Sequence, residues 1–238
     1  MDFIETLYGQ LIDEGRVAKI VDLTSPFNHT SAHYFFNHNI ARALMLPTLV
    51  YGPDSDDDWT HSDSLFLHQA SIIQIITSLE SYYQLVFQTL AKALRTSQVD
   101  AVALSRFIRG NKLLVEFTNA MESQESLDFC IYRILPKYYT FQEKDKIKLA
   151  MTLFGVDPIG RFDQEWANTF GGEENSTANL RHIFVHKGTD FDWQPTKKII
   201  HDKIKDAIVL AAYVDGQVVE KYKKDQYPDL YPEDLTSK

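Results

Sequence analysis

One short segment of the chain gathers a guanidinium and two imidazoles. Arg181 is followed directly by His182, and His186 comes after three apolar residues, with Gly188 two positions later. A histidine changes its charge near neutral pH and can therefore accept and return a proton. An arginine can hold an anionic group through two parallel hydrogen bonds. These residue types make the segment the first candidate for a functional site.

The spacing within this segment limits how its side chains can meet. Arg181 and His186 are five positions apart, which places them about 140° apart around an ideal helix. They therefore do not share one face of an intact helix. Lys187 and Gly188 follow at once, and a glycine at this place is typical of a helix end. The sequence predicts a helix over 176–186 that ends at His186 and leaves its imidazole free to turn away.

The string R-[polar]-x-x-x-H, at the end of a helix and followed by glycine and an acidic loop, resembles the signature of the HEPN family. Members of that family are all-helical domains, and many of them are ribonucleases that need no metal ion. The resemblance covers mainly the region 64–213. It implies that two copies of the motif face each other across a homodimer, so that a composite site supplies the neighbours that Arg181 and His186 lack.

The chemistry that the resemblance implies is transesterification of RNA. His186 would take the proton from a ribose 2′-hydroxyl, whose oxygen then attacks the adjacent phosphorus. Arg181 would stabilise the charge on the phosphorane oxygens, and His182 would orient the reacting groups. Because the 2′-hydroxyl is the nucleophile, DNA would be inert, and neither a metal ion nor another cofactor would be required.

Two further residues support this expected site. Glu80, on a long helix, would face the motif and orient Arg181; the alternative is an ordinary exposed helix residue. Lys187 stands where many members of the family carry asparagine. Gly188 stands where the subclass modified by a nucleotidyltransferase carries a tyrosine, so that form of regulation is not expected.

Other interpretations of the segment stay open. His182 and His186 are four positions apart, which is the spacing of a two-histidine metal site on a helix. No glutamate follows His182 and no third ligand is evident, so no metal is expected here. Arg181 has a purely structural alternative, a surface ion pair with Glu174 or another helix carboxylate, which would contribute little to stability.

Basic residues elsewhere are candidates for contacts with RNA phosphates. Arg106, Arg109 and Lys112 lie with aromatic and apolar neighbours at an expected turn, and Lys197 and Lys198 open the final helix. The formal net charge of −9 opposes nonspecific binding of nucleic acid, because such binding depends on neutralising phosphates. RNA binding would therefore need a local basic groove, and most basic runs are only solvated faces.

Three further histidines lie in the N-terminal part of the chain, at His29, His33 and His38. Their spacings of four and five residues fit neither one helix face nor a known ligand pattern. A solvated polar face is therefore favoured over a metal site.

The segments that position these residues are helical by their hydrophobic periodicity. The strongest pattern covers 64–94, which contains neither glycine nor proline and has apolar residues at three- and four-residue spacing. Such a helix would be roughly 45 Å long and would form the spine of a bundle. No convincing strand is found. Further helices are expected over 1–22, 31–46, 99–107, 112–121, 126–135, 141–154, 176–186 and 196–213.

The expected fold class is all-α, a helical bundle of HEPN type built on one long helix. Trp166 and Phe170 are expected to anchor an otherwise irregular segment that precedes the motif. The expected organisation is an N-terminal helical extension over 1–62, a HEPN-like bundle over 63–215 and an extended C-terminal tail over 216–238, pinned by its tyrosines.

The cellular setting follows from composition. The single cysteine, Cys130, excludes an internal disulfide and fits a reducing cytoplasm. The N-terminus lacks a basic region followed by an apolar core, and no run approaches the roughly 20 apolar residues that a membrane span needs. A soluble, cytoplasmic protein without a membrane partner is expected.

The function that the resemblance implies is a HEPN-type endoribonuclease that acts as a homodimer. Its role would be that of a prokaryotic toxin or antiviral defence effector, held in check by an inhibitory protein partner. The alternative is a non-catalytic scaffold of HEPN-like shape that binds a protein or a nucleotide. The acidic net charge and the aromatic tail favour this alternative.

Overall fold

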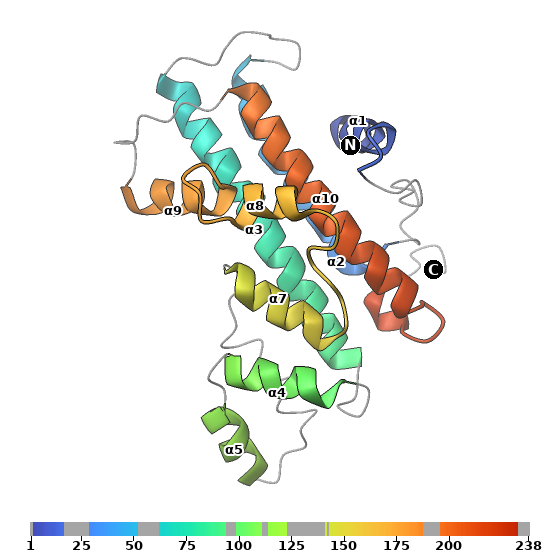
Figure 1. Cartoon of the computed structure of the whole chain (residues 1–238). Helices are drawn as coiled ribbons and strands as arrows, with labels where there is room; N and C mark the ends of the chain where they lie inside the picture. The colour runs from blue at the N-terminus through green and yellow to red at the C-terminus, as the bar shows by residue number, and fades with distance from the viewer. Residues whose placement is uncertain are drawn as a thin grey trace.

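The computed structural model of the chain is all-helical, as expected (Figure 1). It describes residues 2–16, 29–51, 62–93, 99–110, 114–122, 141, 143–187 and 196–232. Within these ranges no strand occurs. The helices are α1 Asp2–Asp13, α2 Ser31–Tyr51, α3 Ser62–Ala93, α4 Ala101–Gly110, α5 Leu114–Glu122, α7 Lys144–Leu153, α8 Asp163–Phe170, α9 Thr177–Lys187 and α10 Lys197–Lys221, followed by the short 3-10 helix η2 Pro228–Leu230.

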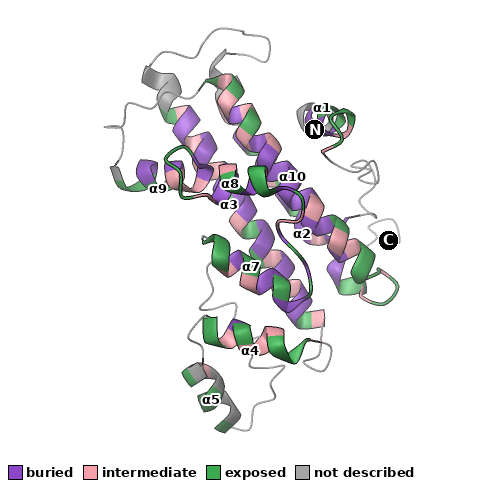
Figure 2. Cartoon of the chain, viewed as in Figure 1, coloured by how far each residue is buried: buried purple, intermediate pink, exposed green. Residues whose placement is uncertain are grey.

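The spine of the bundle is α3, packed against α2 and α10. Its bounds agree with the expected long helix to within two residues at each end. The apolar residues that recur at three- and four-residue spacing are buried, which gives α3 and α10 the continuous buried stripes seen in Figure 2. The stripe of α3 includes Ile72, Ile75, Ile76, Leu79, Tyr83, Val86 and Leu90.

α2 belongs to the same core, although it falls within the segment 1–62 that was expected as an extension. Phe36, Ile40 and Leu44 of α2 are buried in one hydrophobic cluster with α3 and α10. The helix was expected to end before Pro47, but it continues to Tyr51. A proline inside a helix removes one backbone hydrogen bond without necessarily ending the helix.

The N-terminal segment is tied to the bundle by an ion-pair network. Arg16 follows α1, and its Nη2 donates to Asp206 Oδ1 of α10 at 2.8 Å and to Glu165 Oε1 of α8 at 3.2 Å. Asn168 Nδ2 of α8 donates to the other oxygen of Asp206 at 2.9 Å. This network joins the end of the N-terminal segment to α8 and α10, and the buried Tyr8 of α1 joins the same segment to Asn37 of α2.

The C-terminal segment differs from the expected extended tail. α10 continues to Lys221 and is followed by a turn and η2. Tyr222 donates its hydroxyl to Phe154 O at 2.7 Å, and Tyr231 donates to Tyr222 O at 2.6 Å. Tyrosines therefore do pin this segment, and they do so by turning it back onto the bundle. Residues 233–238 lie outside the described residues.

Among the remaining short helices, α7 and α9 pack on α3, α8 packs on α10 and α9, and α4 packs on α7. α8 lies in the segment that was expected to be irregular, and it is helical because Trp166 and Phe170, four positions apart, both pack into the core with ring centroids 4.8 Å apart. Their anchoring role is confirmed. The expected helix over 126–135, with Cys130, lies outside the described residues.

Among the described residues, no helix is both long enough and apolar enough to cross a membrane.

Candidate functional site

The motif segment forms α9, which lies across α3 (Figure 1). Ser176 begins the helix, since its Oγ accepts a hydrogen bond from Asn179 N at 3.3 Å in the manner of an N-cap. Leu180, Ile183 and Phe184 are buried and hold one face of α9 in the core. The face that remains carries the candidate functional side chains.

Arg181 lies on the side of α9 that meets α3. Its Nη1 is 3.7 Å from Glu80 Oε1, and the two side chains are 26% and 16% exposed. The Nε of Arg181 is buried and has no acceptor among the residues that the structure describes. Of the two carboxylates considered from the sequence, Glu80 rather than Glu174 therefore forms the ion pair. The guanidinium is half-buried and lies within ion-pair distance of the Glu80 carboxylate.

His182 and His186 lie on the exposed part of α9. Their ring centroids are 4.5 Å apart, with 53° between the ring planes. α9 ends at Lys187, within one residue of the expected end at His186, and the His186 imidazole, which was expected to turn away, lies beside His182. Arg181 and His186 consequently point in different directions within one copy of the chain, as helix geometry requires.

The supporting and metal-binding expectations for α9 can be placed only in part. The side chain of Lys187 and the exit over 188–195 lie outside the described residues. In the part of the chain that is described, no third histidine, cysteine or carboxylate joins His182 and His186 in a metal-binding group.

The basic residues expected to contact phosphates are spread over the fold. Arg106 and Arg109 are exposed on α4, and Figure 1 places α7 between α4 and α9. Arg106 lines a surface hollow together with the carboxylates Asp100 and Asp145, so its surroundings are of mixed charge. Lys112 lies outside the described residues. The structure brings neither Arg106 nor Arg109 to the motif.

The lysines of α10 are placed in its N-terminal half. Lys197 is half-buried and Lys198 is exposed, both in the first turn. Further along, Lys203 Nζ donates to Asn175 O at 2.6 Å, and Lys205 Nζ lies 3.0 Å from Glu14 Oε1. The last two cations are therefore committed to contacts within the chain.

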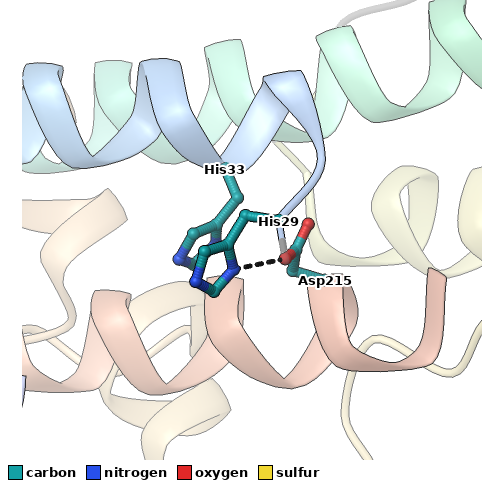
Figure 3. Close-up of side chains that lie close together, drawn as sticks. All are labelled: His29, His33 and Asp215. Atoms are coloured by element: carbon teal, nitrogen blue, oxygen red, sulfur yellow. Dashed lines mark hydrogen bonds and ion pairs between the residues drawn. The ribbon is translucent and has the colours of Figure 1, made fainter. Parts of the chain in front are cut away.

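A second cluster of chemically capable residues was not expected. His29 and His33 were predicted to lie on a solvated face, but both are buried, with 6% and 0% of their surface exposed. They meet Asp215, which is 2% exposed, because the N-terminal end of α2 packs on the C-terminal half of α10 (Figure 3). Only His38, the third member of the group, is exposed as predicted.

Asp215 is the centre of this cluster. His29 Nδ1 lies 3.0 Å from Asp215 Oδ2. Asp215 Oδ1 accepts a hydrogen bond from the Thr30 backbone N–H at 3.3 Å and a short one from the Thr30 hydroxyl. The Thr30 hydroxyl oxygen also accepts from His33 N at 3.2 Å, which makes Thr30 the N-cap of α2. One threonine thus links the start of α2 to α10.

The His33 ring is contacted by the Tyr8 hydroxyl and by the ring of His29. Its Nε2 lies 3.0 Å from the Tyr8 hydroxyl, which donates to Asn37 Oδ1 at 2.8 Å and therefore accepts from His33. Its ring stacks on His29 with centroids 4.7 Å apart and 20° between the planes. Burial, opposed by the charge of Asp215, lowers the pKa of His33 to about 4. The imidazole is consequently neutral at pH 7.

The sequence alone could indicate the two histidines of this cluster but not its carboxylate. The pair His29 and His33 is four residues apart, but it begins before the helix and is not a helical pair. Asp215 is remote in the sequence and lies on another helix, so only the folded chain identifies it as their neighbour.

Comparisons of this chain with protein-family models, with curated proteins and with solved structures found no match.

Proposed function

We propose that this chain is a metal-independent endoribonuclease of the HEPN type and that α9 carries its reacting groups. The observation behind the proposal is that Arg181 is held against Glu80 of α3 while His182 and His186 lie together at the surface. A positioned guanidinium and an accessible imidazole pair supply the charge stabilisation and the proton transfer that phosphodiester cleavage requires.

The reaction proceeds without a metal ion. The imidazole of His186 removes the proton from a ribose 2′-hydroxyl, and the 2′-oxygen bonds to the adjacent phosphorus. The bond from phosphorus to the 5′-oxygen breaks, and that oxygen takes a proton from an imidazolium of the same site. Arg181 neutralises the charge on the non-bridging oxygens. The products are a 2′,3′-cyclic phosphate and a 5′-hydroxyl end.

A homodimer is part of the proposal, because Arg181 and His186 diverge on a single α9. A twofold contact places the Arg181 of one copy beside the His186 of the other. Val185 lies on the exposed side of the same helix with 55% of its surface accessible, and it offers an apolar contact for the second copy.

If one arginine and one histidine from different copies suffice, mixed dimers of Arg181→Ala and His186→Ala chains regain part of the activity that each variant lacks alone.

The decisive experiment uses purified chain and single-stranded RNA in EDTA. We expect cleavage of RNA but not of DNA, and no cleavage where the target ribose is 2′-deoxy. His186→Ala is expected to lose at least about 100-fold in rate, the contribution of a general base. His38→Ala is the matched control, since His38 is an exposed histidine on α2. Equal cleavage by wild type and His186→Ala, or cleavage by neither, contradicts the proposal.

The biological role belongs to the same proposal. A cytoplasmic RNase of this kind acts as a prokaryotic growth-arrest toxin or antiviral defence effector, and an inhibitory protein partner keeps it inactive. This role rests on the resemblance of the Arg181–His186 segment to the HEPN motif.

The second candidate is a non-catalytic scaffold of HEPN-like shape that binds a protein or a nucleotide. It is favoured by the net charge of −9 and by the engagement of Lys203 and Lys205 in contacts within the chain. In that case Arg181→Ala and His186→Ala change partner binding or thermal stability, and no variant changes phosphodiester chemistry.

A further inference from the structure

We propose that His29, His33 and Asp215 form a buried site for one divalent transition-metal ion, and that zinc fits its donors best. One potential ligand atom from each residue lies within 4.8 Å of the other two. Figure 3 shows the two imidazoles stacked at the start of α2, with His29 joined to the carboxylate on α10. Two imidazole nitrogens and one carboxylate oxygen are a common donor set for zinc.

A ring nitrogen of His33 supplies the strongest argument. His33 Nδ1 is buried and has no hydrogen-bonding partner among the described residues. Buried polar atoms in native proteins are nearly always partnered, so this nitrogen requires an explanation. An ion bound between His29, His33 and Asp215 takes His33 Nδ1 as a ligand and so gives it the partner that it lacks.

The other hydrogen bonds of the cluster resemble the outer shell of a metal site. A ligating histidine usually has its second nitrogen hydrogen-bonded, and the Tyr8 hydroxyl supplies that bond to His33 Nε2. Thr30 holds Oδ1 of Asp215 and leaves Oδ2 towards His29. The 3.0 Å between His29 Nδ1 and Asp215 Oδ2 is close to the roughly 3 to 3.5 Å that separates two ligand atoms of one zinc ion.

A hydrogen bond between His29 Nδ1 and Asp215 without any ion is the competing explanation. It satisfies the carboxylate, but it leaves Nδ1 of His33 without a partner. An ion bound by His29 Nδ1, His33 Nδ1 and Asp215 Oδ2 also gives His33 Nδ1 a partner. Because His29, His33 and Asp215 are buried, the ion joins α2 to α10 and has a structural rather than a catalytic role.

The test uses the untagged full-length chain loaded with zinc and then exchanged into metal-free buffer. We expect one zinc per chain to remain, and a thermal midpoint raised by roughly 5 °C or more at a hundredfold excess over the Kd. Asp215→Asn, which keeps an acceptor for Thr30, and His33→Gln are expected to lose the ion and the shift. No retained zinc in the wild-type chain contradicts the proposal.

The matched control is the double variant His182→Ala, His186→Ala, because this exposed pair on α9 also has its rings in contact. It is expected to retain the zinc; loss of the ion from this variant overturns the assignment. Nitrogen-15 spectra of the wild-type histidine rings give an answer even if the core variants do not fold. Zinc should shift the ring signals of His29 and His33, and unchanged signals contradict the site.

Failure of this inference is distinguishable from failure of the proposed function. RNA cleavage is measured with and without EDTA, at a temperature where the metal-free chain remains folded by circular dichroism. If the metal-free chain cleaves RNA, the proposed function is supported whether or not the chain can bind zinc. If the chain binds zinc but does not cleave RNA, only the buried site is supported.

Discussion

Arg181 of α9 and Glu80 of α3 face each other across the contact of the two helices, with 3.7 Å between Nη1 and Oε1. The pair is partly exposed, so its contribution to stability is at most about 1 kcal/mol. Under the proposed function its consequence for the site is larger, because Glu80 would then be the positioning residue that holds the guanidinium of Arg181.

The variant Glu80→Gln therefore distinguishes an effect on the position of the Arg181 guanidinium from an effect on the stability of the fold. Under the proposed function we expect the rate of RNA cleavage to fall roughly tenfold, since a guanidinium out of place loses transition-state contacts. The free energy of unfolding should change by less than about 1 kcal/mol. Glu143→Gln, which removes an exposed ion pair with Lys146 on α7, is the control and should leave the rate unchanged. A Glu80→Gln chain with the full rate contradicts this role.

Thr30→Val should be more costly than an ordinary cap substitution. It removes two hydrogen bonds of the hydroxyl, the N-cap bond of α2 and the bond to the buried Asp215. We expect a loss of roughly 2–3 kcal/mol in the free energy of unfolding. Thr196→Val removes only the exposed cap of α10 and should cost about 1 kcal/mol. Urea unfolding of both variants checks this, and equal losses would count against the Thr30–Asp215 link.

Two glycines should respond to alanine with opposite signs. Gly160 has a φ of 54°, and a Cβ there would overlap the side chain of Tyr213. Gly160→Ala is expected to destabilise the chain by at least about 1–2 kcal/mol. Gly216 lies inside α10 with open space around it, so Gly216→Ala should stabilise by about 0.5–1 kcal/mol. Thermal midpoints measure both, and a stabilised Gly160→Ala chain would contradict the geometry.

Acid should destabilise the fold through His68 on α3. Burial lowers the pKa of His68 to about 4, whereas an unfolded histidine has a pKa of about 6.5. Between these values the unfolded chain binds a proton that the folded chain does not, so stability is complete above about pH 6.5 and falls as the pH decreases towards 4.

The loss amounts to about 1.4 kcal/mol per pH unit in that window for one such group. His68→Leu should flatten the pH dependence of unfolding between pH 6.5 and 5. Part of the slope remains, because the pKa of His33 is lowered in the same direction. Urea unfolding at several pH values tests this, and an unchanged slope would show that His68 is not the group responsible.

Local patterns in the sequence were enough to predict most of the described helices. The recurrence of apolar residues along α3 requires only that one face be buried, and a helix with that spacing buries it whatever the partner. The motif on α9 and its approximate end followed in the same way. α8 and the continuation of α2 through Pro47 were missed, because packing in the core outweighs local signals from glycine and proline.

The sequence by itself determined that the chain is an all-α bundle built on α3 and that Arg181, His182 and His186 lie on one helix. Only the tertiary structure decided that Arg181 meets Glu80 and that His29 and His33 meet Asp215. The physical reason is the separation of these residues along the sequence. Helix periodicity relates residues a few positions apart, whereas these meetings depend on how α2, α3, α9 and α10 pack to bury their apolar faces together.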